Sequence, residues 1–356
     1  YKNCTIWENI RSYIRITNTG VNVKNRPPFK QSFTFDDVLL IPQESKVLPR
    51  DVDLQTKLTK DINLNIPILS AAMDTVTESD MAIALARTGG IGVIHKNLDI
   101  KDQANMVDRV KRSESGMIQN PITVNKNATI AEAKKIMSTY RISGLPVVEN
   151  EMLKGIITNR DIRFETNDML CVSERMTSDR LVTVPEGTSL NKAKNILQKH
   201  RIEKLLVVDK MQNLTGLITV KDIQKNEDYP NACKDKNGRL RVGAAIGVSN
   251  DFRERAAELL SVDVDIVVID TAHGHSKGVL RSIEKLKSDL PNISIIAGNV
   301  ATGEGTQALI GSGVDCVKVG IGAGASCTTR VIAGVGVPQL TAIMDSVDVA
   351  KKEGIP

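Results

Sequence analysis

Residues 266–270 read Ile-Val-Val-Ile-Asp, four consecutive apolar residues followed by a carboxylate, and the segment after them has helical spacing. Five other short apolar runs alternate with helical segments in the same way, at residues 66–70, 91–95, 242–246, 293–299 and 316–320. Alternation of strand with helix predicts parallel strands, because each parallel connection needs a crossover, and buried parallel strands are almost wholly apolar. We therefore expect an α/β fold.

Two α/β architectures fit six such units, a doubly wound sheet and a (β/α)8 barrel. Polar and glycine residues recur at the carboxyl ends of the expected strands, where barrels place their active sites, so the pattern favours the barrel. Six of the eight strands would be present, and the last two would follow Pro356. The chain begins with Tyr1 and stops as a new apolar segment begins, so we expect it to be a fragment of a longer protein.

The interval between the second and third runs is too long for one helix, and it contains an internal repeat. Residues 122–124 (Ile-Thr-Val) recur about sixty positions later as 182–184 (Val-Thr-Val), and residues 155–158 (Gly-Ile-Ile-Thr) recur as 216–219 (Gly-Leu-Ile-Thr). Each copy predicts a strand, an amphipathic helix, two strands and a final helix that opens at an Asp. The two copies would pack as one module inserted into the α/β domain. A duplicated structural unit without a ligand is the alternative.

These boundaries divide the chain into four parts. Residues 1–30 are an unassigned N-terminal extension, 31–115 and 227–356 are the two parts of the barrel, and 116–226 are the inserted module, with repeats at about 117–165 and 176–226.

The composition excludes several classes of function. Lys and Arg number 47 against 42 Asp and Glu, spread along the chain without a basic block, so nucleic acid is not expected as a main partner. The sequence contains no apolar run long enough to span a membrane and no signal-peptide pattern, so we expect no membrane partner. Five scattered cysteines without CxxC spacing fit reduced thiols in an intracellular, cytoplasmic chain better than a disulfide framework or a zinc site.

The densest group of residues that could do chemistry is the loop at 320–330, Gly-Ile-Gly-Ala-Gly-Ala-Ser-Cys-Thr-Thr-Arg, directly after an expected strand. Its alternating glycines permit positive φ and let a ligand approach the main chain closely. Cys327 lies in a polar turn close to Arg330, where positive charge and backbone donors favour the thiolate that a nucleophile needs. A buried structural cysteine is the alternative, and we expect that role for Cys316 within its apolar run.

Residues 319–339, which contain this Cys-Thr-Thr-Arg, closely resemble the catalytic loop of the inosine 5′-monophosphate (IMP) dehydrogenase family. Further segments that resemble the family are 33–42, 70–78, 89–96 and 270–276. The inserted repeat resembles a tandem pair of CBS domains, a Bateman module. The resemblance extends over about residues 32–356 and implies a barrel enzyme that uses NAD.

The resemblance implies that Cys327 attacks C2 of the IMP purine, that hydride passes to NAD, and that water hydrolyses the resulting thioimidate to xanthosine monophosphate. Covalent attack of this kind divides one difficult step into two easier ones. Thr329 matches a residue near the hydrolytic water. Met73 matches the residue that packs against the hypoxanthine, although without the resemblance it would be interpreted as a core residue.

The resemblance also implies where NAD and a cation bind. Asp270 matches the carboxylate that holds the nicotinamide ribose, although a lone Asp after a strand can equally cap a helix. The other implied positions are Gly320, Ile321 and Gly322 under the nicotinamide, Asn299 facing the same opening, and the carbonyl groups of Gly322, Gly324 and Cys327 around K⁺. His273 and His275 suggest a metal pair, but without a third ligand we expect them to shape a turn or contact the cofactor.

For the module, the resemblance implies a bound purine nucleotide. Thr158 and Asp161 in the first copy, and Thr219 and Asp222 in the second, match the segment in which an Asp holds a ribose. The family forms homotetramers, which CBS pairing can join into octamers. Which nucleotide binds, and whether it activates or inhibits, stays open.

The sequence departs from the family at the position that meets the IMP phosphate. The family has a Ser two residues before the catalytic Cys, whereas this chain has Ala325 there and Ser326 one position later. Ser326 would therefore reach the phosphate only if the loop rotated. Residues 1–30 match nothing in the family.

Three functions stay open at this point. The first is NAD-dependent IMP oxidation, and the second is the NADPH-dependent reductive deamination of GMP by a GMP reductase, which shares the barrel and the Cys loop. The third is a nucleotide sensor with a degenerate barrel. The CBS pair favours the dehydrogenase. A molecule that ended at Pro356 is expected not to turn over, because an open six-strand barrel exposes apolar edges and the family's catalytic base follows later.

Overall fold

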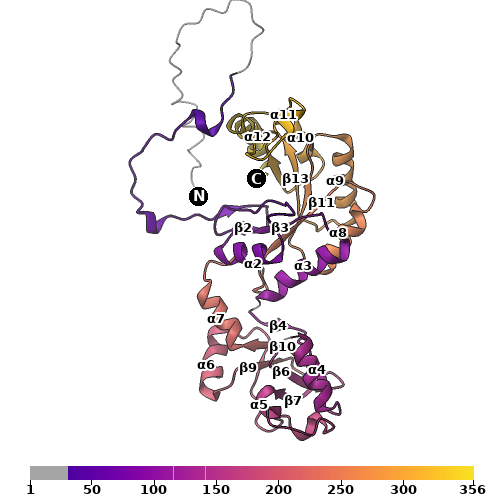
Figure 1. Cartoon of the computed structure of the whole chain (residues 1–356). Helices are drawn as coiled ribbons and strands as arrows, with labels where there is room; N and C mark the ends of the chain where they lie inside the picture. Colours follow the sequence, from indigo (N-terminus) through magenta and orange to yellow (C-terminus); the bar gives the residue numbers. More distant parts are fainter. Residues whose placement is uncertain (1–30, 115, 141) are drawn as a thin grey trace, which may run out of the picture.

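The computed structural model describes residues 31–114, 116–140 and 142–356. The predicted N-terminal extension at 1–30 lies outside the described residues. The described chain folds into an α/β part and a separate inserted part, which Figure 1 shows one below the other.

The α/β part is built on a parallel sheet of five strands. In chain order these are β3 (Gly92–Ile94), β11 (Val242–Ile246), β12 (Ile266–Asp270), β13 (Ile295–Val300) and β14 (Cys316–Val319). Each strand pairs in parallel with the next one along the chain, so the order has no reversal point of the kind that a doubly wound sheet has. The predicted α/β fold is confirmed.

The first predicted strand, at 66–70, differs from the expectation. It contributes one parallel bridge, from Leu69 to Ile91, in place of a hydrogen-bonded strand. The Ile68 N–H donates to the Ile66 carbonyl at 2.9 Å instead of to the neighbouring chain, which interrupts the ladder. The bridge still puts this segment beside β3, in the order that the sequence predicts.

Helices cover one face of the sheet (Figure 1). They are α2 (Ser79–Thr88), α3 (Ile100–Ser113), α8 (Phe252–Ser261), α9 (Lys277–Asp289), α10 (Gly303–Gly311) and α12 (Gln339–Glu353). Their buried positions recur at helical spacing; in α9 these are Val279, Ile283 and Leu286. The helix begins where the Ser276 side chain accepts a hydrogen bond from the Val279 N–H.

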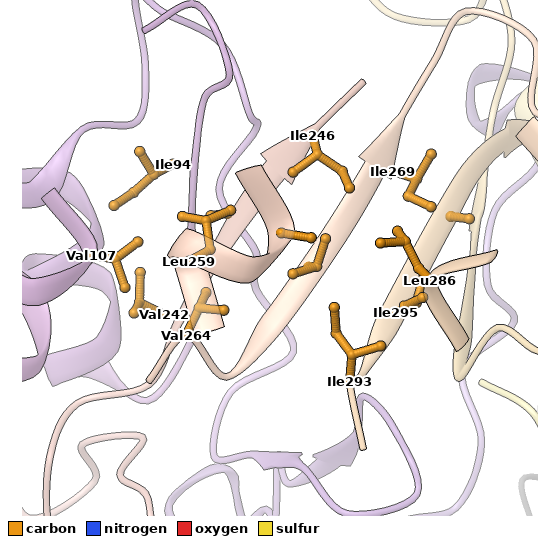
Figure 2. Packing of buried hydrophobic residues seen from close by; sticks show 14 of the residues in the cluster. Ile94, Val107, Val242, Ile246, Leu259, Val264, Ile269, Leu286, Ile293 and Ile295 are labelled. Carbon is orange, nitrogen blue, oxygen red and sulfur yellow. The ribbon is translucent and has the colours of Figure 1, made fainter. Parts of the chain in front are cut away.

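Alternate residues of the strands point to opposite faces of the sheet and pack into two separate hydrophobic cores. Ile94, Ile246 and Ile269 pack with Val107 and Leu259 of the helices, as Figure 2 shows. The preceding residues of the same strands, such as Val93, Ala245 and Val268, belong to a second core on the opposite face. The hairpin of β1 (Thr56–Lys57) and β2 (Asn63–Leu64) packs into that second core, as does Cys316, which is buried as predicted.

The inserted part has two halves with the same order of elements. The first has β5 (Val124–Asn125), α4 (Ile130–Tyr140), β6 (Gly144–Glu149), β7 (Met152–Thr158) and α5 (Asn159–Ile162). The second has β8 (Thr183–Pro185), α6 (Leu190–His200), β9 (Lys204–Val208), β10 (Leu214–Thr219) and α7 (Val220–Asp228), with β4 (Ile118–Gln119) added beside β10. In both halves the first strand is parallel to the second, and the second is antiparallel to the third.

The insertion leaves from the end of α3 and returns to the start of β11, so both connections lie at the amino-terminal edge of the sheet. Lys225 Nζ ties the two connections together by donating to the Ser113 carbonyl at 2.8 Å. The carboxyl edge, at the opposite end, stays free for a site. Among the described residues, none of the helices combines the length and the apolar character that crossing a membrane requires.

Candidate active site

The predicted site residues gather at the carboxyl edge of the sheet, on three neighbouring strands. Asp270 is the last residue of β12, Asn299 lies in β13, and Gly320 directly follows β14. The register pairs Asp270 with Gly298 and Gly298 with Lys318, so these residues form one row across the sheet. The separate strand-end predictions therefore converge on one place.

Asp270 is held by two lysines that the sequence analysis did not select. Lys318 Nζ lies 2.6 Å from Asp270 Oδ1, and Lys96 Nζ donates to the Asp270 carbonyl at 2.9 Å. A lysine within an otherwise apolar run at 316–320 was the signal that could have pointed to Lys318. The alternative role of Asp270 as a helix cap is excluded, because Ser276 caps the helix that follows.

Asn299 faces the glycine loop, as predicted. Its Nδ2 donates to the Gly320 carbonyl at 2.9 Å. Its Oδ1 is buried and has no hydrogen-bond partner among the described residues. A buried amide oxygen without a donor is costly, so this atom is available to a ligand N–H.

The loop after β14 requires glycine at two positions. Gly320 has a φ of +136° and Gly322 a φ of +78°. A Cβ on Gly322 would lie 2.8 Å from the Val335 carbonyl oxygen and 2.9 Å from the Gly336 Cα. The outgoing and returning limbs of the loop therefore touch, and the Val337 N–H closes them by donating to the Ile321 carbonyl at 3.1 Å.

Cys327 lies inside this closed loop. Its N–H donates to the Gly324 carbonyl at 3.0 Å, and its Sγ lies 3.4 Å from Thr329 Oγ1 at the start of α11 (Thr329–Ile332). The Thr329 hydroxyl and N–H, the Gly322 N–H and the positive charge of Arg330 lower the pKa of the Cys327 thiol. By contrast, burial raises the pKa of Cys316 to about 12, so of the two thiols only Cys327 has a pKa shifted toward the thiolate.

Met73 lies on a loop that buried Thr77 fixes. Thr77 Oγ1 contacts the Ala71 carbonyl at 2.6 Å and Ser70 Oγ at 2.8 Å, and the Thr77 N–H donates to the Met73 carbonyl. The Met73 side chain is 46% exposed, which excludes the alternative role as a core residue. Ser70, which follows the bridge at Leu69, was not predicted as a site residue from the sequence.

The remaining loop predictions have mixed support. Ser326, Ala325 and Gly324 are exposed, so no described side chain covers the expected phosphate position. His273 and His275 have ring centroids 6.4 Å apart, and the described residues contain no group of three or more His, Cys, Asp or Glu side chains that could hold a metal. The Gly274 N–H donates to the Asn299 carbonyl, which fits the role of these residues in a turn.

The Thr and Asp pairs of the inserted part form capping boxes at the starts of α5 and α7. Asp161 Oδ2 accepts from the Thr158 N–H and hydroxyl, both at 2.7 Å, and Asp222 Oδ2 accepts from the same groups of Thr219 at 3.1 and 2.6 Å. Burial raises the pKa of Asp222. Thr219 and Asp222 line a cleft of about 1360 Å³ between the two halves and the α/β part, whereas Thr158 and Asp161 do not.

A parallel α/β sheet whose carboxyl edge carries a glycine-rich loop, with a thiol of lowered pKa on that loop, is an arrangement typical of α/β enzymes. The profile of the IMP dehydrogenase / GMP reductase domain matches residues 32–356, and the chain belongs to this family. It is thus an oxidoreductase by family.

Two similar proteins are inosine-5′-monophosphate dehydrogenases. The one from Aquifex aeolicus is 58% identical over 330 residues, which cover 92% of this chain and 67% of the relative. The one from Bacillus subtilis is 56% identical over 328 residues, which cover 91% of this chain and 67% of the relative. This chain therefore spans about two thirds of the length of these relatives.

The fold is also similar to a solved structure of GMP reductase from Trypanosoma brucei in complex with guanosine 5′-monophosphate. The TM-score is 0.83 at 37% identity, over 92% of this chain and 71% of the other. The same TM-score and identity relate the chain to that reductase in complex with guanosine 5′-triphosphate, over 92% of this chain and 80% of the other.

Proposed function

We propose that the protein oxidises IMP to xanthosine monophosphate with NAD as the hydride acceptor, as a step in guanine nucleotide synthesis. The observation that carries the proposal is the Cys327 thiol, whose pKa is lowered and which lies on a loop beside Asp270 and Asn299 at the carboxyl edge of the sheet. Identities of 56–58% to proteins named inosine-5′-monophosphate dehydrogenase support the same substrate.

In the proposed reaction Cys327 is the nucleophile. Its thiolate forms a bond to C2 of the purine, C2 becomes tetrahedral, and the hydrogen on C2 leaves with its electron pair. NAD, when bound, supplies the acceptor for that hydride. Water then adds to C2 of the thioimidate, the C2–S bond breaks with its electrons returning to Sγ, and one proton is released. IMP, NAD⁺ and water thus give xanthosine monophosphate, NADH and H⁺.

Thr329 acts directly on the sulfur. Its hydroxyl, 3.4 Å from Cys327 Sγ, stabilises the thiolate before attack and again when the sulfur leaves. Thr329 also matches the family residue near the hydrolytic water, which supports a role in hydrolysis of the thioimidate. Thr329 is therefore proposed as the second catalytic residue.

The residues present fit the nicotinamide end of NAD. Asp270 offers a carboxylate to ribose hydroxyls, with Lys318 holding it in place. The buried Asn299 Oδ1 has no partner among the described residues and can accept an N–H from a carboxamide. Gly320, Ile321 and Gly322, which follow β14 at the same edge of the sheet, are proposed to lie under the nicotinamide ring.

Met73 and Ser326 are proposed as substrate-binding residues. The half-exposed Met73 thioether is flexible and polarisable, which suits packing against a purine face. Ser326 is exposed on the same loop as Cys327 and can donate to a phosphate. Ala325, in the family's serine position, removes one donor, so we expect weaker phosphate binding than a serine there would give.

We also propose a K⁺ site at the carbonyl groups of Gly322, Gly324 and Cys327. Carbonyl oxygens can replace the hydration shell of this ion. The Gly324 carbonyl accepts one hydrogen bond, from Cys327, and keeps a second lone pair for a cation. Assays in which KCl is replaced by choline chloride should lose turnover while the Cys327 thiol stays alkylatable.

For the architecture, we propose a (β/α)8 barrel with an inserted CBS module. The consecutive parallel order of the strands supports a barrel, and the two matching halves at 117–228 support a CBS pair. The proposed divisions are barrel parts at 31–115 and 227–356 around a module at 116–226. A purine nucleotide at the module, homotetramers that can form octamers, and a cytoplasmic location complete the proposal.

The test compares Cys327→Ala with Cys171→Ala in the full-length protein. Cys171 is a partly exposed thiol of the inserted part and serves as the matched control. Cys327→Ala should abolish NADH formation from IMP, and Cys171→Ala should leave it unchanged. An unchanged rate in Cys327→Ala would remove this cysteine from the chemistry.

The second candidate is a GMP reductase, which the fold similarity to the Trypanosoma brucei enzyme supports. Supplying GMP with NADPH, and IMP with NAD, to the same preparation separates the two. Turnover only with GMP and NADPH would select the reductase.

A further inference from the structure

Gln339 connects the far side of the catalytic loop to the strand on which the loop begins. It is the first residue of α12, 20 positions after Val319, the last residue of β14. Its Nε2 nevertheless donates to the Val319 carbonyl, the last in β14, at 3.1 Å. The Gln339 side chain thus links the two ends of the loop at 320–338.

The Gln339 amide also lies directly against Gly320. A Cβ on Gly320 would be 2.7 Å from Gln339 Oε1 and 3.2 Å from Nε2, so the amide occupies the space that a side chain would need. Asn299 Nδ2 donates to the Gly320 carbonyl, and the Gly320 N–H donates to the Val300 carbonyl at 2.8 Å. Gly320 is therefore held from three directions.

The position of Gly320 sets the position of Gly322, two residues on. The Gly322 N–H is among the groups that lower the pKa of the Cys327 thiol, so this limb of the loop lies on the side of the sulfur. On its other side Gly322 packs against Val335 and Gly336 of the returning limb. A short, contacting path therefore runs from Gln339 through Gly320 and Gly322 to the sulfur.

The base from which Gln339 reaches is rigid. Leu340, Thr341 and Ala342, the next three residues of α12, are buried. Thr341 is further fixed by Phe33, because the Phe33 N–H donates to Thr341 Oγ1 at 2.8 Å and the Thr341 N–H donates to the Phe33 carbonyl. A side chain on such a fixed helix end can hold a loop to sub-ångström tolerance.

We propose that Gln339 is a positioning residue for the nucleophile: it clamps the Val319–Gly322 limb and thereby keeps the Gly322 N–H beside Cys327 Sγ. The inference rests on the proposed function only in taking Cys327 as the nucleophile. A neutral amide suits the position, since its N–H₂ group satisfies the Val319 carbonyl without adding charge beside a thiolate.

The experiment measures the pH dependence of iodoacetamide alkylation at Cys327, read by mass spectrometry of the peptide that contains it. Gln339→Leu removes the donor without adding charge, and Gln339→Glu replaces it with a carboxylate that repels the Val319 carbonyl. Gln307→Leu and Gln307→Glu make the same changes at an exposed position of α10 and are the matched controls.

Both Gln339 variants should raise the inflection of the alkylation profile by about half a pH unit, which slows alkylation at neutral pH by about threefold. The Gln307 variants should match the wild type. An unchanged inflection in Gln339→Leu overturns the proposal, even if Gln339→Glu shifts, because the effect would then be one of charge and not of position. If Gln339→Leu does not fold, Gln339→Asn, which withdraws the amide by one methylene, decides by the same criterion.

NADH formation from IMP is measured alongside and keeps the two hypotheses apart. If the Gln339 variants shift the inflection but the wild-type protein does not oxidise IMP, the result supports the clamp and contradicts the proposed function. An unshifted inflection in an active enzyme contradicts the clamp alone.

Discussion

Lys318 Nζ lies 2.6 Å from Asp270 Oδ1, although their strands β14 and β12 are separated by β13. The residue between them in the row is Gly298, and a Cβ there would lie 2.7 Å from Lys318 Cβ. Because the central position has no side chain, the two outer ones meet across it. This row places a paired carboxylate at the proposed ribose site.

Replacing Lys318 by Met should weaken NAD binding. The variant removes the Lys318 ammonium group that holds the Asp270 carboxylate. The carboxylate is then less firmly oriented toward the ribose. We expect the KM for NAD to rise about fivefold, corresponding to about 1 kcal/mol for a partly exposed ion pair, with little change in the KM for IMP. Steady-state kinetics of Lys318→Met against Lys285→Met, an exposed lysine of α9, provide the measurement. An equal rise for both substrates would argue for a general loss of structure instead.

Replacing Thr329 by Val should make Cys327 less reactive at neutral pH. The Thr329 hydroxyl is the largest cause of the lowered thiol pKa, so its removal raises that pKa. The thiolate fraction below the pKa then falls, and alkylation slows by about three- to tenfold at neutral pH while converging with the wild type at high pH. Thr328→Val, one position earlier and exposed, is the control. A parallel loss at every pH would point to altered access and contradict the electrostatic explanation.

The strand order of the α/β part could be predicted because each strand is a self-contained apolar run, and parallel connection then fixes the sequence of neighbours. The two cysteines could also be distinguished from their neighbours in sequence. Cys316 lies in an apolar run and was predicted as a core residue, whereas Cys327 lies in a polar turn and was predicted as the nucleophile. The expected strand at 66–70 was not found, because the Ile68 N–H bonds locally to the Ile66 carbonyl and only a bridge at Leu69 remains.

Lys318 and Gln339 could not be predicted from their neighbours in sequence. Lys318 reaches Asp270 only because the register aligns both with Gly298 across two strand pairs. Gln339 reaches Val319 because the loop closes on itself and α12 starts beside β14. Both contacts depend on tertiary alignment, which propensity and motif spacing do not contain.

Replacing Lys111 by Met should destabilise the α/β part, where α3 packs beside the segment that leads into β11. Lys111 Nζ lies 3.0 Å from Asp235 Oδ2 and 2.9 Å from Asp265 Oδ2, and all three side chains are nearly inaccessible. Removing the cation leaves each buried carboxylate with one arginine only, Arg239 at 3.0 Å from Asp235 and Arg241 at 3.3 Å from Asp265, so we expect unfolding to be easier by about 2–3 kcal/mol. Chemical denaturation of Lys111→Met against Lys101→Met, an exposed lysine of the same helix, gives the comparison.

The same variant has a predicted pH dependence. Burial raises the pKa of Asp265 in the folded protein, and loss of Lys111 raises it further. A carboxyl group whose folded-state pKa is raised is penalised as it ionises with rising pH, so the deficit of Lys111→Met should be smaller at about pH 5 than at about pH 7. A deficit that grew as the pH fell would contradict the assignment of the cost to ionised Asp265.

Asp222→Asn should weaken purine nucleotide binding at the inserted module more than Asp161→Asn does. Both carboxylates make the same capping box, so either substitution has a similar effect on its own helix. They differ in place, because Asp222 lines the cleft of about 1360 Å³ and Asp161 does not. Titration with ATP and with GTP, followed by calorimetry, should show about a tenfold loss of affinity for Asp222→Asn, since a carboxylate bonded to ribose hydroxyls contributes on the order of 1.5 kcal/mol. Equal losses of affinity in the two variants would show that the effect comes from loss of the helix caps. That result would contradict nucleotide binding in the cleft.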